Sequence, residues 1–151
     1  MVIIKQMGSS VKNNADALIF HTALCAACEM RIIMGKYHFI IIGAGWRALY
    51  YVRIAKAMPD IFCLDAVYCR TQEKADKIAR EYQIHTTTSK EECAAYKPDF
   101  AVIAVNKAEI CNVAVEWMDR GITVLSETPA ALDTEALKKL YGYYKAGKKQ
   151  V

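Results

Sequence analysis

Glycine and proline are scarce in this sequence, with 7 glycines and 3 prolines among 151 residues. Such a composition is typical of a globular domain and argues against a disordered or collagen-like chain. Long apolar runs are also missing, because none reaches the about 20 residues that a membrane-spanning helix needs. The length allows one domain with a proper core. We therefore expect a cytoplasmic globular domain that makes no membrane contact.

Neither sign of charge dominates. The sequence has 20 Lys and Arg against 16 Asp and Glu, a formal net charge of +4. The lysines are dispersed apart from the tail "KAGKKQV", so the charge pattern does not indicate nucleic-acid binding. Most of the six cysteines lie in apolar segments, which indicates reduced core thiols in a reducing compartment. These cysteines are Cys25, Cys28, Cys63, Cys69, Cys93 and Cys111.

The first 33 residues do not share the pattern of the rest. They show no clean helical or strand period, and Met34 stands just before the first strand-like run, so we interpret 1–33 as a weakly ordered extension and 34–151 as the domain. A secretory signal with a lipoprotein-type cysteine is one alternative. A zinc site at Cys25 and Cys28, with His21 nearby, is another, but no second ligand pair follows at metal-binding spacing. We predict no metal site.

From residue 37 onward, strand-like and helix-like segments alternate with short connections. The apolar runs predict strands at 37–43, 61–69, 84–88, 99–105 and 122–127. Helical spacing predicts helices at 46–58, 90–96 and 107–120. It also predicts a helix after Thr71 with an apolar face of Ala75, Ile78, Ala79 and Tyr82, and a last helix after Asp133 that contains Leu137, Leu140 and Tyr141. This alternation predicts an α/β fold with a doubly wound parallel sheet of about five strands and helices on both faces, three layers in all.

Several residues mark where these helices begin or end. Thr71 and Asp133 stand at N-cap positions, and Ser89 with Glu92 forms a capping-box pattern. Gly121 is placed to end the helix at 107–120.

A glycine-rich hexapeptide follows the first strand: Gly43-Ala44-Gly45-Trp46-Arg47-Ala48, which fits G-x-G-x-x-G/A. Gly43 permits a tight exit from the strand, Gly45 lets a diphosphate approach the backbone, and Ala48 lets the helix pack close to the sheet. The N–H groups and positive dipole end of the following helix attract phosphate. Because the motif lies between a strand and a helix, it favours dinucleotide binding over a tight turn without a ligand.

The identity of the nucleotide depends on the end of the second strand. An acidic residue there would bind the ribose hydroxyls of NAD, but the sequence has Cys69, Arg70 and Thr71, and Asp65 lies mid-strand. Arg70 can pair with a 2′-phosphate, so NADP is mildly favoured over NAD. The alternative is that Arg70 is simply an exposed residue at a strand end.

Four segments together resemble the cofactor domain of the glucose–fructose oxidoreductase / inositol dehydrogenase family (Gfo/Idh/MocA). They are "IIIGAGWRA", "CRTQEKADKIAREY", "KPDFAVIAV" and "WMDRGITVLSETPAALDTEALKKL". The resemblance implies an N-terminal Rossmann domain of an NAD(P)-dependent oxidoreductase that acts on a sugar, polyol or related small molecule. Family members also have a C-terminal α/β domain that shapes the substrate site and often the oligomer interface.

The resemblance also implies roles for individual residues. Gly43, Ala44, Gly45, Trp46 and Arg47 would bind the cofactor phosphates, Arg70 would select the nucleotide, Val105 and Asn106 would border the ribose, and Glu127 and Pro129 would lie near the nicotinamide. The lysine of the family's Glu-Lys-Pro motif is Thr128 here, so the catalytic residue is unknown. A threonine hydroxyl forms hydrogen bonds but cannot act as a cationic donor. Ile110 stands where the family often has histidine.

Two functions follow from these matches and departures. The first is the cofactor half of an oxidoreductase, which a second domain would complete for its small-molecule substrate. The second is a stand-alone or truncated binding module without catalysis. An exposed edge of its sheet would allow it to form a homo-oligomer. The pair Tyr141 and Lys145 has the Tyr-x-x-x-Lys spacing of short-chain dehydrogenases, but no serine precedes it on a suitable strand, so we interpret it as part of a helix face.

Overall fold

The computed structural model describes residues 35–146. The predictions made for 1–33, including the extension, the signal alternative and the Cys25–Cys28 pair, lie outside these residues. The strands are β1 (Tyr37–Ile42), β2 (Phe62–Tyr68), β3 (Thr86–Thr87), β4 (Phe100–Ile103) and β5 (Thr123–Ser126). The helices are α2 (Trp46–Ala57), α3 (Gln72–Tyr82), α4 (Lys90–Ala95), α5 (Ile110–Asp119) and α6 (Thr134–Lys145).

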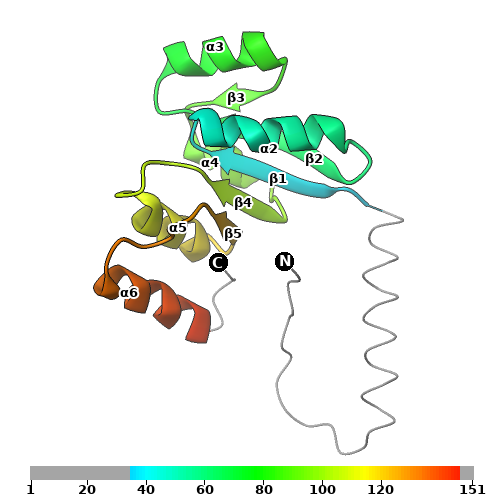
Figure 1. The fold of residues 1–151 in the computed structure, drawn as a ribbon. Coiled ribbons are helices and arrows are strands. Elements are labelled where there is room, and N and C mark those ends of the chain that lie inside the picture. The colour runs from blue at the N-terminus through cyan, green and yellow to red at the C-terminus, as the bar shows by residue number, and fades with distance from the viewer. Residues whose placement is uncertain (1–34, 147–151) are drawn as a thin grey trace, which may run out of the picture. The chain divides into compact units, whose positions relative to one another are not determined.

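The strands form one parallel sheet in the order β3-β2-β1-β4-β5 (Figure 1). β1 lies at the centre, and the chain builds outward first through β2 and β3 and then through β4 and β5. The strand order therefore reverses between β1 and β4. In sheets of this kind, ligands bind beyond the carboxyl ends of the strands at this reversal. The predicted fold class is confirmed.

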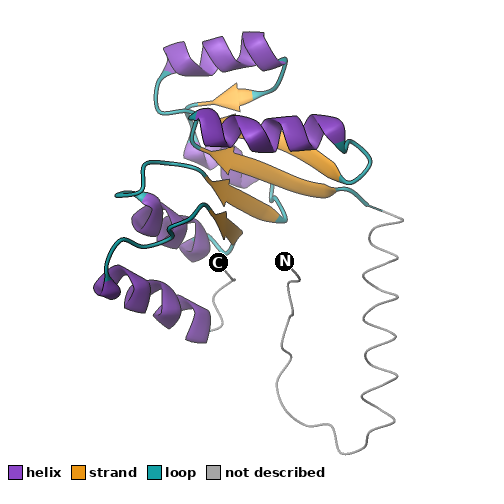
Figure 2. Cartoon of the chain, in the orientation of Figure 1, coloured by secondary structure: helices purple, strands orange, loops and turns teal. Residues whose placement is uncertain are grey.

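Two apolar cores lie on opposite faces of the sheet, and Figure 2 shows helices on both faces. In β1, Phe39 and Ile41 pack into the core that contains Val52 of α2 and Ile78 of α3. Ile40 and Ile42 pack into the other core with residues of α5 and α6, and Trp117 there is fully buried. Burial on both faces explains why β1 is a continuous apolar run.

Most predicted elements are present, but some of their ends and faces differ. The third strand is shorter than predicted, with only two residues. α5 begins at Ile110 rather than 107, because the preceding residues form a turn in which Asn106 accepts hydrogen bonds from Ala108 and Glu109. The last helix is present as α6 and contains Leu137, Leu140 and Tyr141, of which Leu140 is buried and the other two are more than half exposed.

The predicted helix ends are confirmed in part. The Asp133 carboxylate accepts the Ala136 N–H at 2.8 Å, and Ser89 Oγ accepts the Glu92 N–H at 3.1 Å. Thr71 is at the N-cap of α3 but forms no side-chain cap bond. Gly121 follows α5 with φ of 76°, and its N–H donates to the Met118 carbonyl.

None of the helices within 35–146 is long and apolar enough to cross a membrane. The predicted state of the cysteines holds in the same range: Cys69, Cys93 and Cys111 are buried free thiols, and Cys63 is half-buried.

Candidate functional site

Gly43 fits its position only as glycine. Its φ is +119°, and a Cβ built on it would lie 2.3 Å from the carbonyl oxygen of Ala104. Its N–H donates to the Tyr68 carbonyl at 3.1 Å. The loop therefore leaves β1 packed between the ends of β2 and β4, at the carboxyl edge of the sheet and beside the reversal of strand order.

Gly45 has the opposite surroundings. Its backbone is extended, with φ of −84° and ψ of 176°, and a Cβ built there would meet no other residue within 4 Å. This position is open, as a cradle for a bound group requires. A cofactor diphosphate can approach the backbone here because no side chain of Gly45 or of another part of the described fold fills the position.

The N-terminus of α2 supplies the attraction for an anion. Gly45 is the N-cap and offers no side-chain acceptor, and the first turn contains no acidic residue. The N–H groups at this end and the helix dipole therefore favour a negatively charged ligand. Trp46 and Arg47 are exposed beside this end, and Ala48 is fully buried against the sheet.

Arg47 does not stand free at this end of α2, since its guanidinium pairs with the Glu127 carboxylate. Tyr51, one helical turn further along α2, donates its hydroxyl hydrogen to Glu127 Oε1 at 2.7 Å. The backbone N–H of Glu127 donates to the Ile103 carbonyl, which extends the pairing of β5 with β4. These contacts join the glycine loop and its helix to the segment after β5.

The pKa shifts agree with a charged Glu127. Burial acts to raise the pKa of Glu127, but hydrogen bonds from Tyr51 and Arg47 and the positive charge of Arg47 outweigh it, so the pKa is lowered. Burial, the hydrogen bond to Glu127 and its negative charge raise the pKa of Tyr51 to about 12. Glu127 is therefore an anion and Tyr51 a neutral hydrogen-bond donor at neutral pH.

The other predicted cofactor residues lie along the same edge. Val105 follows β4, and its Cγ1 would lie 3.4 Å from a Cβ at Gly43. Asn106 is exposed, although its Oδ1 accepts the Ala108 N–H at 3.2 Å. Thr128 and Pro129 are exposed after β5 and are joined by a cis peptide bond.

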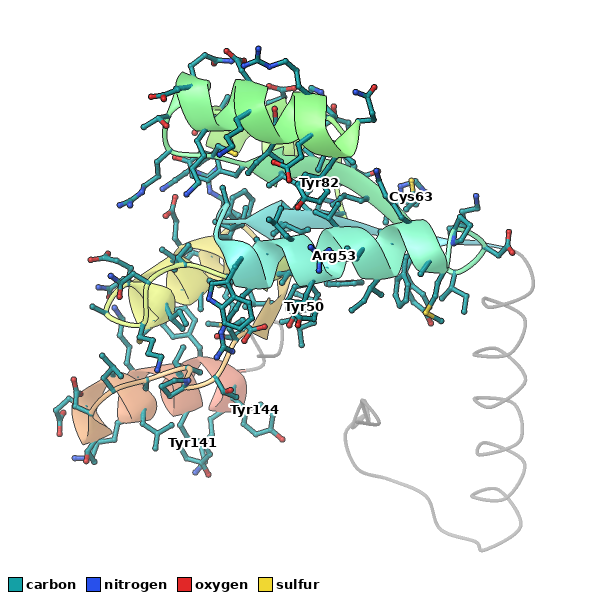
Figure 3. The ribbon with its side chains drawn as sticks, turned by 45° about the horizontal axis from the view of Figure 1, so that its top comes forward. Tyr50, Arg53, Cys63, Tyr82, Tyr141 and Tyr144 are labelled. Carbon is teal, nitrogen blue, oxygen red and sulfur yellow. The ribbon has the colours of Figure 1, made fainter. Side chains whose placement is uncertain are left out.

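Two predicted features are placed elsewhere. Ile110 is 1% exposed and belongs to the core, so its side chain is no candidate for the site. Tyr141 and Tyr144 project from α6, as Figure 3 shows, and Lys145 Nζ lies 5.2 Å from the Tyr141 ring centroid. This exposed cluster on one helix supports the interpretation of Tyr141 and Lys145 as a helix face.

Arg70 lies exposed directly after β2 and forms no hydrogen bond or ion pair with any residue in 35–146. Burial raises the pKa of the neighbouring Cys69, and the positive charge of Lys74, in the first turn of α3, acts against this rise. Asp65 does not contribute to this end of β2, because its carboxylate forms a hydrogen bond with His38 at the start of β1. Among residues 35–146, the end of β2 therefore presents positive charge without an ion-pair partner.

The structure thus brings the glycine loop, Arg47, Glu127 and Pro129 to one edge of the sheet. The sequence interpretation missed Tyr51. The sequence feature that could have identified Tyr51 is its four-residue spacing from Arg47, which places both side chains on one face of α2.

Comparisons with known proteins give the family of the chain. The family model described as "Oxidoreductase family, NAD-binding Rossmann fold" (GFO_IDH_MocA) matches residues 37–151. No curated protein sequence matches the chain.

Solved structures match the fold. The UDP-N-acetylglucosamine 3-dehydrogenase GnnA from Acidithiobacillus ferrooxidans is 26% identical with a TM-score of 0.65, over 75% of this chain and 36% of that one. An NAD-binding protein from Listeria innocua is 25% identical with a TM-score of 0.65, over 76% and 34%. The WlbA dehydrogenase from Chromobacterium violaceum, solved with NADH and UDP-GlcNAcA, is 19% identical with a TM-score of 0.66, over 75% and 33%.

The chain thus spans about a third of the length of these solved relatives. The family match covers most of the chain and begins at the first strand of the sheet. The chain belongs to the Gfo/Idh/MocA family of oxidoreductases and carries its NAD-binding Rossmann fold.

Proposed function

We propose that residues 34–151 are the nucleotide-binding domain of an NAD(P)-dependent oxidoreductase, with 1–33 as an extension, and that the cofactor diphosphate binds over Gly45 at the N-terminus of α2. The observation that carries this proposal is the open position over Gly45 beside an uncapped helix end. Backbone N–H groups of Gly45, Trp46 and Arg47 would face the diphosphate. The dipole of α2 then contributes without any side-chain charge.

The remaining edge residues would position the other parts of the cofactor. Val105 and Asn106, after β4, would border the ribose, and Glu127 and Pro129, after β5, would lie near the nicotinamide. The bound nicotinamide supplies hydride transfer. Thr128 offers a hydroxyl that can form a hydrogen bond but no cationic donor, so the group that transfers the proton differs from the family's lysine.

A sugar derivative is the proposed substrate. The two named dehydrogenases among the solved relatives carry UDP-sugar names or ligands in their descriptions. The family match favours an oxidoreductase over a stand-alone binding module without catalysis. A homo-oligomer formed through an edge of the sheet and a cytoplasmic location also belong to this proposal.

NADPH is the proposed preferred cofactor. Arg70 is exposed and unpaired within the described fold, and Lys74 adds positive charge at the same end of β2. A guanidinium can bind a 2′-phosphate in a bidentate manner. The carboxylate that would bind the NAD ribose is missing from the last residues of β2, since Asp65 is bonded to His38.

Gly45→Ala tests the diphosphate position. The new Cβ meets no protein atom within 4 Å, so the fold should tolerate it, but it occupies the open position over the backbone. We expect NADPH and NADH to bind at least about tenfold more weakly, a loss of about 1.4 kcal/mol, in a titration that follows nicotinamide fluorescence. Gly142→Ala in α6 is the matched control, because a Cβ there also meets nothing within 4 Å. Unchanged affinity in Gly45→Ala, or no binding to the wild type, would contradict the proposal.

Arg70→Ala tests the choice of nucleotide. Removing the guanidinium should weaken NADPH binding about tenfold, the order of one charge-assisted hydrogen bond, and leave NADH binding nearly unchanged. The same fluorescence titration with both nucleotides measures the ratio. Arg53→Ala serves as control, since Arg53 is exposed on α2 beside Tyr50 (Figure 3). An equal loss of affinity for NADPH and NADH would show that Arg70 does not bind the 2′-phosphate.

A further inference from the structure

Three potential metal ligands meet at the amino-terminal end of the sheet, the end opposite the glycine loop. His38 of β1 is paired in register with Cys63 of β2, and Asp65 follows two residues later. Figure 3 labels Cys63 at this end of the sheet. One ligand atom from each residue, His Nδ1, Cys Sγ and a carboxylate oxygen, lies within 4.8 Å of the other two.

An irregularity in strand pairing brings Asp65 into this group. Phe39 pairs with Leu64 and Ile40 pairs with Ala66, so Asp65 is an extra residue of β2 without a partner in β1. Such a β-bulge redirects a side chain, and bulges are frequent next to functional sites. Here the redirected side chain is a carboxylate that reaches both His38 Nδ1, at 2.8 Å, and Cys63 Sγ, at 3.8 Å.

The Asp65 carboxylate is only half satisfied. Its side chain is 9% exposed, and Oδ1 receives both contacts. Oδ2 is buried and has no hydrogen-bond partner among the described residues. A buried carboxylate oxygen without a partner is costly, and a bound cation would satisfy it.

We propose that His38, Cys63 and Asp65 form a binding site for a divalent transition-metal ion of the zinc class. One imidazole nitrogen, one thiolate and one carboxylate oxygen are the donor types that Zn²⁺ binds, and three protein ligands leave a fourth position for water. Mg²⁺ and Ca²⁺ prefer oxygen ligands and do not suit a thiolate. When the metal binds, the Cys63 thiol proton leaves to solvent.

Small side-chain movements would complete the site. Tetrahedral zinc holds its ligand atoms about 3.3–3.8 Å apart, so the imidazole nitrogen must move away from Oδ1, which now lies 2.8 Å from it, for both residues to bind one ion. His38 is free to do so, because its side chain is 53% exposed. The Asp99 carboxylate, which accepts the His38 backbone N–H at 2.9 Å, adds negative charge beside the group, against one positive charge from Lys36.

This site is independent of the proposed cofactor function, since it lies at the other end of the strands. It also has no signature in the sequence. His38 and Cys63 become neighbours only through the pairing of β1 with β2, and the reach of Asp65 depends on the bulge.

Cobalt binding tests the proposal on the full chain. Co²⁺ added to the reduced wild-type protein should give a sulfur-to-cobalt charge-transfer absorption band, and Zn²⁺ should displace the cobalt. Cys63→Ser should abolish the band. His38→Gln and Asp65→Asn should each weaken Co²⁺ binding at least about tenfold. Circular dichroism of each variant shows whether it is folded.

Cys25→Ser/Cys28→Ser is the matched control, because this pair is the other candidate thiol site in the sequence. The double variant should keep the band and the cobalt affinity of the wild type. The proposal is overturned if the wild type gives no band, if folded Cys63→Ser keeps it, or if Cys25→Ser/Cys28→Ser loses it.

Discussion

Gly43 and Gly45 share one loop but obey different constraints. Gly43 is fixed by the protein itself, through a positive φ and the close approach of the Ala104 carbonyl. Gly45 has an ordinary backbone conformation and open space, so nothing within the described fold requires glycine there. The first glycine is therefore needed for folding, and the second for the proposed ligand. A substitution at Gly43 should therefore lower the stability of the fold, whereas a substitution at Gly45 should weaken nucleotide binding.

Gly43→Ala should lower the free energy of unfolding by about 2 kcal/mol or more, since strained positive φ alone costs of order 1–3 kcal/mol and the Cβ contact adds to it. Urea denaturation followed by circular dichroism measures the change. Gly142→Ala should instead be neutral or stabilising by about 0.5–1 kcal/mol, as for a glycine inside a helix. A Gly43→Ala protein that unfolds at the wild-type urea concentration would refute the steric explanation.

At the scale of single elements, α3 and α4 begin differently although both have hydroxyl residues at the N-cap. Ser89 Oγ accepts the Glu92 N–H, whereas Thr71 forms no side-chain cap bond. The reciprocal half of the capping box at Ser89 is missing, because the Ser89 N–H donates to Thr87 Oγ1 instead. Glu92 itself bonds to Thr87 and His85, and these hydrogen bonds lower its pKa.

Ser89→Ala should therefore cost about 1 kcal/mol of stability, the usual value for loss of a side-chain cap. Thr71→Ala should cost only a few tenths, roughly the range of surface substitutions. Both values come from urea denaturation without nucleotide, so that the position of Thr71 near the proposed site has no influence. Equal losses in the two variants would show that the observed cap bonds do not determine the difference.

The order and type of the elements could be predicted from the sequence, because strand and helix periods are local properties. Their ends were less predictable. α5 starts at Ile110 because the side chain and carbonyl of Asn106 hold the preceding turn, a detail that periodicity does not encode. Leu137 and Tyr141 follow helical spacing in α6 yet are exposed, since periodicity does not say what covers a face.

At the scale of the whole fold, the predictable part of the site is the part that is contiguous in sequence. The glycine loop was found from six neighbouring residues and the elements around it. The contact of Arg47 with Glu127 joins residues 80 positions apart, and the group of His38, Cys63 and Asp65 needs both strand pairing and a bulge. Predicting these contacts requires knowledge of the strand order and register, which cannot be read from a single sequence.

Glu127 connects α2 to the segment after β5, so its protonation should affect the stability of the whole fold. Its folded pKa lies below the ordinary value of 4.5. A carboxylate with a lowered folded pKa contributes stability above its unfolded pKa and loses that contribution as the pH falls through the folded pKa. The contribution is therefore complete at neutral pH and disappears in the acid range below 4.5.

Glu127→Gln should consequently be less stable than the wild type by about 1 kcal/mol at pH 7, a charged hydrogen bond discounted for the exposure of Arg47. The difference should shrink toward zero as the pH falls below 4.5, because protonation removes the same charge from the wild type. Urea denaturation of both proteins at a series of pH values measures it. Glu91 and Glu92 also have lowered pKa values, but they are present in both proteins and cancel in the difference. A difference that is independent of pH would show that the carboxylate charge does not hold α2 to the segment after β5.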